Sequence, residues 1–261
     1  MKDASHTYWE GRWGQTSAES LQQALQPYHQ GKDEILDVLK AHGVQHICDA
    51  GCGFGAYSLP LASNGFAVEG FDLSESAVAV TKELLGRYQV DVSGYRAASI
   101  LQTGYEDERF DAAIAYSILD HMTVDDAAKG LRELSRIVRK DGLLVLAFDS
   151  LEEDDLELAH TVMPDGSLLY TQGKRAGMIF HPFTEQELSE LLGDDEVLYR
   201  KTTPKGERVF VVKNARATEP PHIMRTVQKR GLQGVEQANQ RLAWRSESGA
   251  RPVFVWSRSW L

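Results

Sequence analysis

The chain has 261 residues, of which 42% are hydrophobic and 25% are charged, a composition typical of a soluble globular protein with a sizeable core. Its net charge of −10 argues against a body built to bind the phosphate backbone of nucleic acids. The two cysteines provide no disulfide framework, and neither a membrane-spanning apolar run nor a secretory leader is visible, so we expect a cytoplasmic protein.

The N-terminal segment, residues 1–32, is predicted to be helical and carries the large aromatic residues Tyr8, Trp9 and Trp13. Two interpretations stay open for these rings. Either they cover a ligand as a lid, because aromatic faces attract cations, or they pack the first helix on the sheet. Residues 32–39 then carry apolar side chains at helical spacing and predict a further helix.

From His46 onward, short apolar runs alternate with helical patterns. The apolar runs cover residues 47–50, 67–71, 110–115 and 143–148, and the helical patterns cover residues 55–63, 74–87 and 125–139. Thr123 is a predicted N-cap of the third helical pattern, and residues 140–142 are its predicted end. This alternation predicts a doubly wound, parallel α/β sheet that binds its ligand at the carboxyl ends of the strands.

Beyond residue 149 the alternation stops. Residues 151–180 are predicted to form an insertion, a lid over the sheet edge. Residues 184–187 are a predicted capping box that opens a helix, and residues 196–200 and 208–213 are predicted strands joined by a turn. A helix followed by two linked strands predicts an antiparallel last strand.

We expect one domain in residues 33–213, with the insertion inside it, and a basic C-terminal extension in residues 214–261. The extension carries eight Lys and Arg residues against three Glu residues, so its charge is opposite in sign to that of the rest of the chain. We interpret it as a solvated extension in preference to a contact surface for an anionic partner.

The strongest functional signal is the run from Asp49 to Gly55, Asp-Ala-Gly-Cys-Gly-Phe-Gly, which lies between the first apolar run and a helix. Gly51 and Gly53 permit a sharp turn and leave bare main chain against which a ligand can lie. The helix that follows points its amide groups at that ligand. Alone, the loop also fits a dinucleotide, because residues 51–56 satisfy the relaxed dinucleotide-binding pattern.

Two acidic residues favour a different ligand. Asp49, two positions before Gly51, would repel a pyrophosphate and attract the ammonium of an amino-acid group. Asp72 ends the next apolar run, 21 positions after Gly51, which is the spacing of an acid that binds ribose hydroxyls. A ribose acceptor beside a loop that favours a cation, without a phosphate cradle, indicates S-adenosylmethionine.

These motifs resemble those of the class I S-adenosylmethionine-dependent methyltransferases. Residues 47–55 resemble their motif I, and residues 69–74 resemble their second motif. Residues 110–115 resemble their fourth strand, and residues 118–122 resemble the loop after that strand. Residues 134–142 resemble the helix and turn before their fifth strand. The resemblance covers about residues 33–213 and implies a Rossmann-like, mostly parallel seven-stranded sheet. The preferred subclass is the small-molecule type, broadly similar to the tellurite-resistance and thiopurine methyltransferases.

The resemblance also implies roles for individual residues. The methionine part of the cofactor would be held by Asp49, Gly51, Cys52 and Gly53. Asp72 would hold the ribose, and Leu73 would lie against the adenine. Ser99 and Ile100 stand at a position where the family often has an adenine-binding aspartate. Tyr116 would lie beside the methionine arm and the methyl group. Asp120 and His121 stand where many relatives carry a His-His pair, so Tyr116, Asp120 and His121 are the candidate catalytic residues.

The candidate acceptor-binding residues come from two segments. They are Tyr8, Trp9 and Trp13 of the N-terminal segment and Tyr170, Arg175 and His181 of the insertion. The stretch 170–178 combines glycines, cations and an aromatic ring and would overhang the crevice. The alternative interpretation of this stretch is an ordinary surface hairpin.

The expected reaction is methyl transfer to a small-molecule acceptor by in-line displacement, which depends chiefly on alignment. An amine, a thiolate or a soft anion needs no base, whereas a hydroxyl acceptor would lose its proton to Asp120, His121 or a tyrosine. No metal site is expected, since Cys48 and Cys52 lack partner cysteines and are interpreted as a core residue and a loop residue.

Three alternatives stay open. They are an NAD(P)-dependent oxidoreductase, a non-catalytic S-adenosylmethionine-binding module, and a nucleic-acid methyltransferase that uses the basic extension. The sequence leaves the acceptor, the methylated atom and the oligomeric state open.

Overall fold

The computed structural model describes residues 2–22, 33–193 and 195–215. Its helices are α1 (Lys2–Trp13), α2 (Ala18–Gln22), α4 (Asp33–Ala41), α5 (Ser58–Ser63), α6 (Glu75–Arg87), α7 (Val124–Ile137), α8 (Glu153–Glu157) and α9 (Glu185–Leu192), with the short 3-10 turns η1 (Leu119–His121) and η2 (Gly173–Arg175). Its strands are β1 (His46–Ala50), β2 (Ala67–Asp72), β3 (Tyr95–Ala97), β4 (Phe110–Tyr116), β5 (Val138–Phe148), β6 (His160–Val162), β7 (Leu168–Tyr170), β8 (Ile179–Phe180), β9 (Val197–Thr202) and β10 (Arg208–Lys213). Within these ranges no helix is both long enough and apolar enough to cross a bilayer. The predicted basic extension lies outside the described residues from residue 216 onward.

Seven strands form the main sheet, in the order β3-β2-β1-β4-β5-β10-β9. The strands from β3 to β5 are parallel, whereas β10 runs antiparallel to both β5 and β9. The chain reverses between β9 and β10 in a tight turn, where the backbone N–H of Thr203 donates a 2.8 Å hydrogen bond to the carbonyl of Glu207. This topology confirms the prediction of a doubly wound, mostly parallel seven-stranded sheet with an antiparallel last strand.

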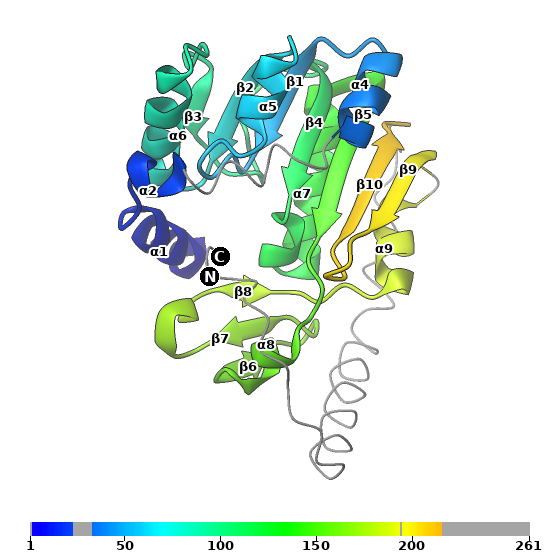
Figure 1. Ribbon diagram of the computed structural model, residues 1–261. Helices are drawn as coiled ribbons and strands as arrows, with labels where there is room; N and C mark the ends of the chain where they lie inside the picture. The colour runs from blue at the N-terminus through cyan, green and yellow to red at the C-terminus, as the bar shows by residue number, and fades with distance from the viewer. Residues whose placement is uncertain (1, 23–32, 194, 216–261) are drawn as a thin grey trace.

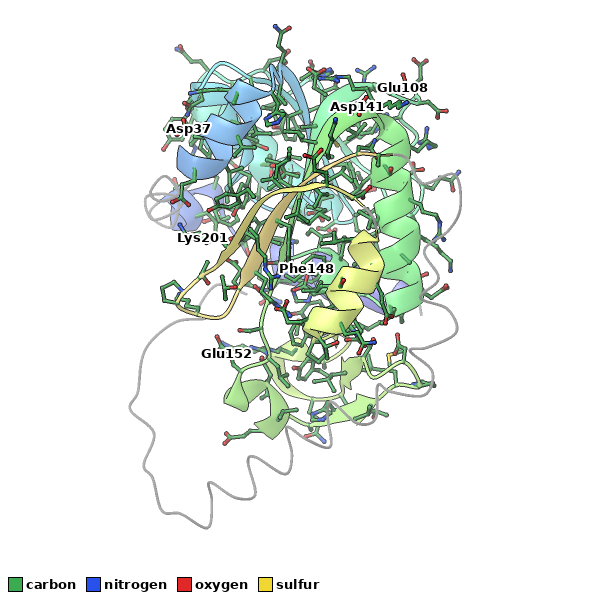
Figure 2. All side chains as sticks on the ribbon, turned by 90° about the vertical axis from the view of Figure 1, so that its right-hand side faces the viewer. Asp37, Glu108, Asp141, Phe148, Glu152 and Lys201 are labelled. Atoms are coloured by element: carbon green, nitrogen blue, oxygen red, sulfur yellow. The ribbon has the colours of Figure 1, made fainter. Side chains whose placement is uncertain are left out.

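Helices cover both faces of this sheet, because successive strand residues point to opposite faces and both sets are apolar. On one face α4 and α5 pack against strand residues such as Ile47 and Val145, and α6 extends this layer over β2 and β3. On the other face α7 and α9 pack against residues such as Cys48 and Leu144. Figure 2 shows α4 on one side of the sheet and α7 and α9 on the other, with Phe148 between the sheet and α9.

A second, three-stranded antiparallel sheet of β6, β7 and β8 is formed within the stretch that the sequence predicts as an insertion. Figure 1 shows this small sheet and α1 together at the end of the main sheet where β1, β2 and β4 finish. Tyr8 of α1 packs with Tyr170 and Phe180 of the small sheet in one apolar cluster. The N-terminal helix and the small sheet therefore lie over the carboxyl ends of the strands, where the ligand site is expected.

Two predicted helix boundaries are wrong. The helix predicted over residues 125–139 ends at Ile137, because β5 begins directly after it and the turn at Asp141, with a φ of +60°, lies inside the strand. The helix predicted over residues 55–63 begins only at Ser58, because positive-φ glycines keep the preceding loop out of helical conformation.

The predicted helix starts with side-chain caps are confirmed. The hydroxyl of Thr123 accepts a 3.2 Å hydrogen bond from the backbone N–H of Asp126 at the start of α7. At the start of α9, Thr184 and Glu187 form the expected reciprocal capping box.

Candidate functional site

The loop between β1 and α5 carries the glycine motif, and its shape requires glycine. Gly51 has a φ of +67°, and a Cβ placed on it would lie 2.3 Å from Cδ1 of Ile118. Gly53 has a φ of +55°, and a Cβ there would lie 3.2 Å from Cζ2 of Trp13. Bare main chain therefore faces two side chains, one from the segment after β4 and one from α1. A ligand can approach this main chain if these side chains change rotamer.

The carboxylate of Asp49 is buried at the end of β1, with only 3% of the residue exposed. Its Oδ2 accepts a 2.5 Å hydrogen bond from the hydroxyl of Ser58, at the start of α5.

The two cysteines flank this part of the motif and are buried. Burial, followed by the charge of nearby carboxylates, raises the pKa of Cys48 and of Cys52. Both thiols are therefore protonated and unreactive at neutral pH.

The carboxylate of Asp72, at the end of β2, joins the second strand to the motif loop. Its Oδ2 accepts a 2.9 Å hydrogen bond from the backbone N–H of Gly53, and its Oδ1 accepts one of 2.9 Å from that of Ser74. Burial raises the pKa of Asp72 to about 6, although these backbone hydrogen bonds oppose the shift. Each oxygen still has a second lone pair, so the carboxylate can also accept hydrogen bonds from two hydroxyls.

Glu10, which the sequence analysis missed, holds α1 against the segment that follows β2. Its carboxylate accepts hydrogen bonds from the hydroxyls of Ser76 and of Ser74, the latter at 2.7 Å. These two hydrogen bonds lower the pKa of Glu10. Because the two serines lie 66 and 64 positions along the chain, no local pattern in the sequence could have indicated the contact.

The predicted adenine-side residues follow β3. Ser99 is partly buried, and its hydroxyl accepts a 3.2 Å hydrogen bond from the backbone N–H of Leu101. Ile100 is buried in the core against α7, where a Cβ on Gly130 would lie 3.4 Å from its side chain. Leu73, on the loop after β2, is partly buried.

Tyr116 ends β4, and its phenol donates a hydrogen bond to the carboxylate of Glu207. Its ring centroid lies 4.3 Å from that of Tyr57. Burial, followed by the charge of Glu207, raises the pKa of Tyr116. In this environment the phenol is a hydrogen-bond donor and not a base.

The other two catalytic candidates, Asp120 and His121, are buried in η1, directly after β4. They lie beside Asp149 at the end of β5, which is also buried, and one ligand atom of each of the three residues lies within 4.8 Å of the others. Burial raises the pKa of Asp120, and the neighbouring His121 opposes this shift. The sequence analysis missed Asp149, although it directly follows the apolar run that predicts β5.

The aromatic residues of α1 reach this region. Trp9 packs edge-on against His121, with ring centroids 5.2 Å apart, and Trp13 covers Gly53 of the motif loop. Tyr8 points instead into the apolar cluster of the small sheet. One helix therefore contacts the motif loop, η1 and the small sheet.

The candidate residues of the insertion mainly contact other residues of the insertion. Tyr170 is buried in its apolar cluster, and Arg175 forms an ion pair with Asp155, which is fully buried. Nδ1 of His181 lies 3.1 Å from the hydroxyl of Ser167. Trp9 thus contacts η1 and Trp13 contacts the motif loop. Of the three insertion residues, His181 reaches η1 through its backbone N–H, which donates a 2.7 Å hydrogen bond to the carbonyl of Asp120.

Comparison with known proteins supports one family. A family model described as a methyltransferase domain matches residues 48–146. The chain is 30% identical over 100 residues to the ubiquinone biosynthesis O-methyltransferase of Coxiella burnetii (strain Dugway 5J108-111), a match that covers 38% of this chain and 42% of that protein. It is 27% identical over 146 residues to the magnesium-protoporphyrin O-methyltransferase of Synechocystis sp. (strain ATCC 27184 / PCC 6803 / Kazusa), over 54% of this chain and 61% of that protein. The chain thus spans less than two thirds of the length of either relative.

The fold is similar to that of magnesium protoporphyrin IX methyltransferase from Synechocystis PCC 6803, solved with bound S-adenosylmethionine. The TM-score is 0.52 at 20% identity, and the match covers 71% of this chain and 78% of that one. Sheet order and motif order agree with the family model, so residues 48–146 are similar to a methyltransferase domain within an α/β fold of this kind.

Proposed function

We propose that this chain transfers a methyl group from S-adenosylmethionine to a small-molecule acceptor by in-line displacement. The observation that carries the proposal is the junction of β1 and β2, where the buried carboxylate of Asp72 is hydrogen-bonded to the motif loop at Gly53. A glycine loop with bare main chain and an adjacent carboxylate suited to ribose hydroxyls fit a nucleoside that carries an amino-acid arm. The relatives named as O-methyltransferases support the same assignment.

The cofactor site in this proposal follows the strand ends. Asp49, Gly51, Cys52 and Gly53 hold the methionine part, Asp72 holds the ribose, and Leu73, Ser99 and Ile100 surround the adenine. The fit rests on the two positive-φ glycines, where the side chains of Ile118 and Trp13 lie against bare main chain and a rotamer change would admit the cofactor. Two buried carboxylates at this junction favour a positively charged nucleoside over a diphosphate, which argues against the dinucleotide alternative.

When bound, the cofactor supplies a methyl group on a positively charged sulfur, which is already activated for displacement. The chain's own residues then have to hold the nucleophile in line with the methyl carbon and the sulfur, a contribution on the order of 7–11 kcal/mol. In our proposal Trp9 and Trp13 cover the reacting groups, and Tyr116 forms part of the wall. Tyr170, Arg175 and His181 act through the small sheet, which supports α1 at Tyr8.

Asp120 and His121 lie at the acceptor end of the proposed site. Nδ1 of His121 lies 3.3 Å from the carbonyl oxygen of Ile179, which can only accept a hydrogen bond, so Nδ1 carries the proton and Nε2 has the free lone pair. For a hydroxyl acceptor, Nε2 is therefore the atom that takes the proton.

Calorimetric titration with S-adenosylhomocysteine tests the cofactor site. The wild-type chain should bind it, and Asp72→Ala should lose about 1.5–3 kcal/mol of binding free energy, the scale of hydrogen bonds to a charged group. Asp37→Ala is the matched control, since Asp37 is exposed on α4, and it should bind as the wild type does (Figure 2). Unchanged affinity in a folded Asp72→Ala variant, or binding of NAD without S-adenosylhomocysteine, would refute the assignment.

A further inference from the structure

We propose that Asp120, His121 and Asp149 bind one divalent metal cation. The two carboxylates and the imidazole come from the segments after β4 and β5, and a ligand atom of each lies within 4.8 Å of the other two. All three residues are buried. This site differs from the prediction of no metal site, which rested on the two cysteines alone and did not include Asp149.

Two atoms of this cluster lack protein partners. Asp120 is 0% exposed, and while its Oδ2 accepts a 2.8 Å hydrogen bond from the backbone N–H of Asp149, its Oδ1 has no partner among the described residues. His121 is 7% exposed, and its Nε2 likewise has none there. Buried polar atoms without partners are costly and uncommon in native proteins, so an acceptor oxygen and a ring nitrogen in one cluster indicate a missing ligand.

His121 is held in the state that a metal ligand requires. The carbonyl of Ile179 can only accept, so it favours the tautomer of the neutral ring with the proton on Nδ1, and in that tautomer Nε2 offers its lone pair for coordination. A backbone carbonyl on the other ring nitrogen is the usual support of a metal-bound histidine. Trp9 and Phe180 pack against the ring, with centroids at 5.2 Å and 5.9 Å, and keep its orientation fixed.

The charge around the cluster also favours a cation. Asp120 and Asp149 lie near a third carboxylate, that of Glu207. The neighbouring guanidinium of Arg208 directs Nη1 to the carbonyl of Phe183, at 2.5 Å, and Nη2 to the carbonyl of Asp149, at 3.1 Å. These hydrogen bonds of Arg208 go to backbone oxygens and not to the carboxylates. A divalent cation would therefore neutralise the negative charge of the carboxylates more directly than Arg208 does.

The donor set selects the class of cation. Two carboxylate oxygens and one imidazole nitrogen suit Mn²⁺, Fe²⁺ or Zn²⁺, and three protein ligands leave coordination positions open. Bonds of about 2.0–2.2 Å place neighbouring ligand atoms roughly 3–3.5 Å apart, so the three atoms would close by at most about 1–2 Å on binding. A metal-bound Nε2 could not also accept a proton, so the metal-ligand and base roles of His121 are alternatives.

The test is titration of the chelator-stripped full chain with Mn²⁺, followed by electron paramagnetic resonance, and with Zn²⁺ by calorimetry. We expect one cation per chain, and binding at least about tenfold weaker in Asp120→Asn, His121→Gln and Asp149→Asn. Glu207→Gln is the matched control: it removes a nearby negative charge but no ligand and should weaken binding less than about threefold.

Melting temperatures show whether each variant is folded and whether the metal stabilises it. Mn²⁺ should raise the melting temperature of the wild type and of Glu207→Gln, but not that of the three ligand variants. Absence of Mn²⁺ and Zn²⁺ binding by the folded wild type, or ligand variants that bind as tightly as the wild type, would overturn the proposal. S-adenosylhomocysteine binding measured on the same samples reports separately on the proposed function.

Discussion

Gly51 is held in a left-handed conformation and is also in close contact with a side chain from another segment. Its φ is +67°, and a Cβ would lie 2.3 Å from Cδ1 of Ile118. We predict that Gly51→Ala lowers the free energy of unfolding by about 1–2 kcal/mol from the backbone conformation alone, with crowding adding to the loss. Urea denaturation measures this change.

Gly11 provides the matched control for this substitution. It lies in α1, has no positive φ, and a Cβ there would meet nothing within 4 Å. Gly11→Ala should therefore be neutral or stabilising by up to about 1 kcal/mol. Equal stability of Gly51→Ala and wild type would show that the loop does not need the observed conformation.

The raised pKa of Asp72 makes stability depend on pH. Between pH 3.8 and about 6 the unfolded chain has lost this proton while the native chain still holds it, so native stability falls as pH rises through this window. Over the whole window the loss amounts to about 3 kcal/mol. Asp72→Asn has no such titration, so its stability relative to wild type should increase by about that amount between pH 4 and pH 7.

Equilibrium unfolding of both proteins at several pH values measures this difference. Any loss of hydrogen bonding in the asparagine variant shifts its stability at every pH alike and leaves the slope unaffected. A difference that stays constant from pH 4 to pH 7 would show that Asp72 is not held at a raised pKa.

Some site residues are predictable from the sequence because strand register is regular. Asp49 lies opposite Gly70 in the parallel pair of β1 and β2, so an acid two residues after Gly70 must end its strand beside the motif loop. Glu10 and Glu207 reach the site from distant segments whose approach is set by tertiary packing, so their roles had no local signal.

At the scale of elements, α1 is the helix that covers the proposed site. Glu10 binds the hydroxyls of Ser74 and Ser76, and Trp13 lies over Gly53. We predict that deletion of residues 1–13 speeds dissociation of S-adenosylhomocysteine by about tenfold or more. In the full chain the hydrogen bonds of Glu10 hold α1 over the site, and their loss removes at least about 1.4 kcal/mol that opposes release of the ligand. Stopped-flow displacement measures the rate.

Two point variants refine this experiment. Glu10→Ala should show a smaller increase in the same direction, whereas Glu19→Ala, exposed on α2, should leave the rate unchanged. A dissociation rate unaffected by the deletion would support the other interpretation of the N-terminal aromatic residues, in which they only pack the helix.

Elements differ in how far the sequence predicts them. The capped helices α7 and α9 follow from residues within one turn of their starts, and the central strands follow from long apolar runs. The strands β6, β7 and β8 were missed, and no pattern of its own predicted β3, which only the resemblance implied before Ser99. Two or three residues show no alternation of their own and depend on pairing with neighbours.

At the scale of the whole molecule, the two ends of the main sheet differ. An open cavity of about 900 Å³ lies at the amino ends of β1 and β2, lined in part by His46, Glu69 and Arg109. In Figure 2 this end is marked by Glu108 and the opposite end by Glu152. At the carboxyl ends the side chains of Trp13 and Ile118 lie against the motif loop instead, so ligand entry there requires that these side chains change rotamer or that α1 or the segment after β4 moves.

In the proposed function, this molecule transfers a methyl group to a small molecule. The most direct measurement follows labelled methyl groups from S-adenosylmethionine into a cell extract incubated with the full chain, separated into small-molecule, protein and nucleic-acid fractions. We predict label in the small-molecule fraction, reduced at least about tenfold with Asp72→Ala. Label in nucleic acid, or no transfer by a chain that binds S-adenosylhomocysteine, would contradict the account.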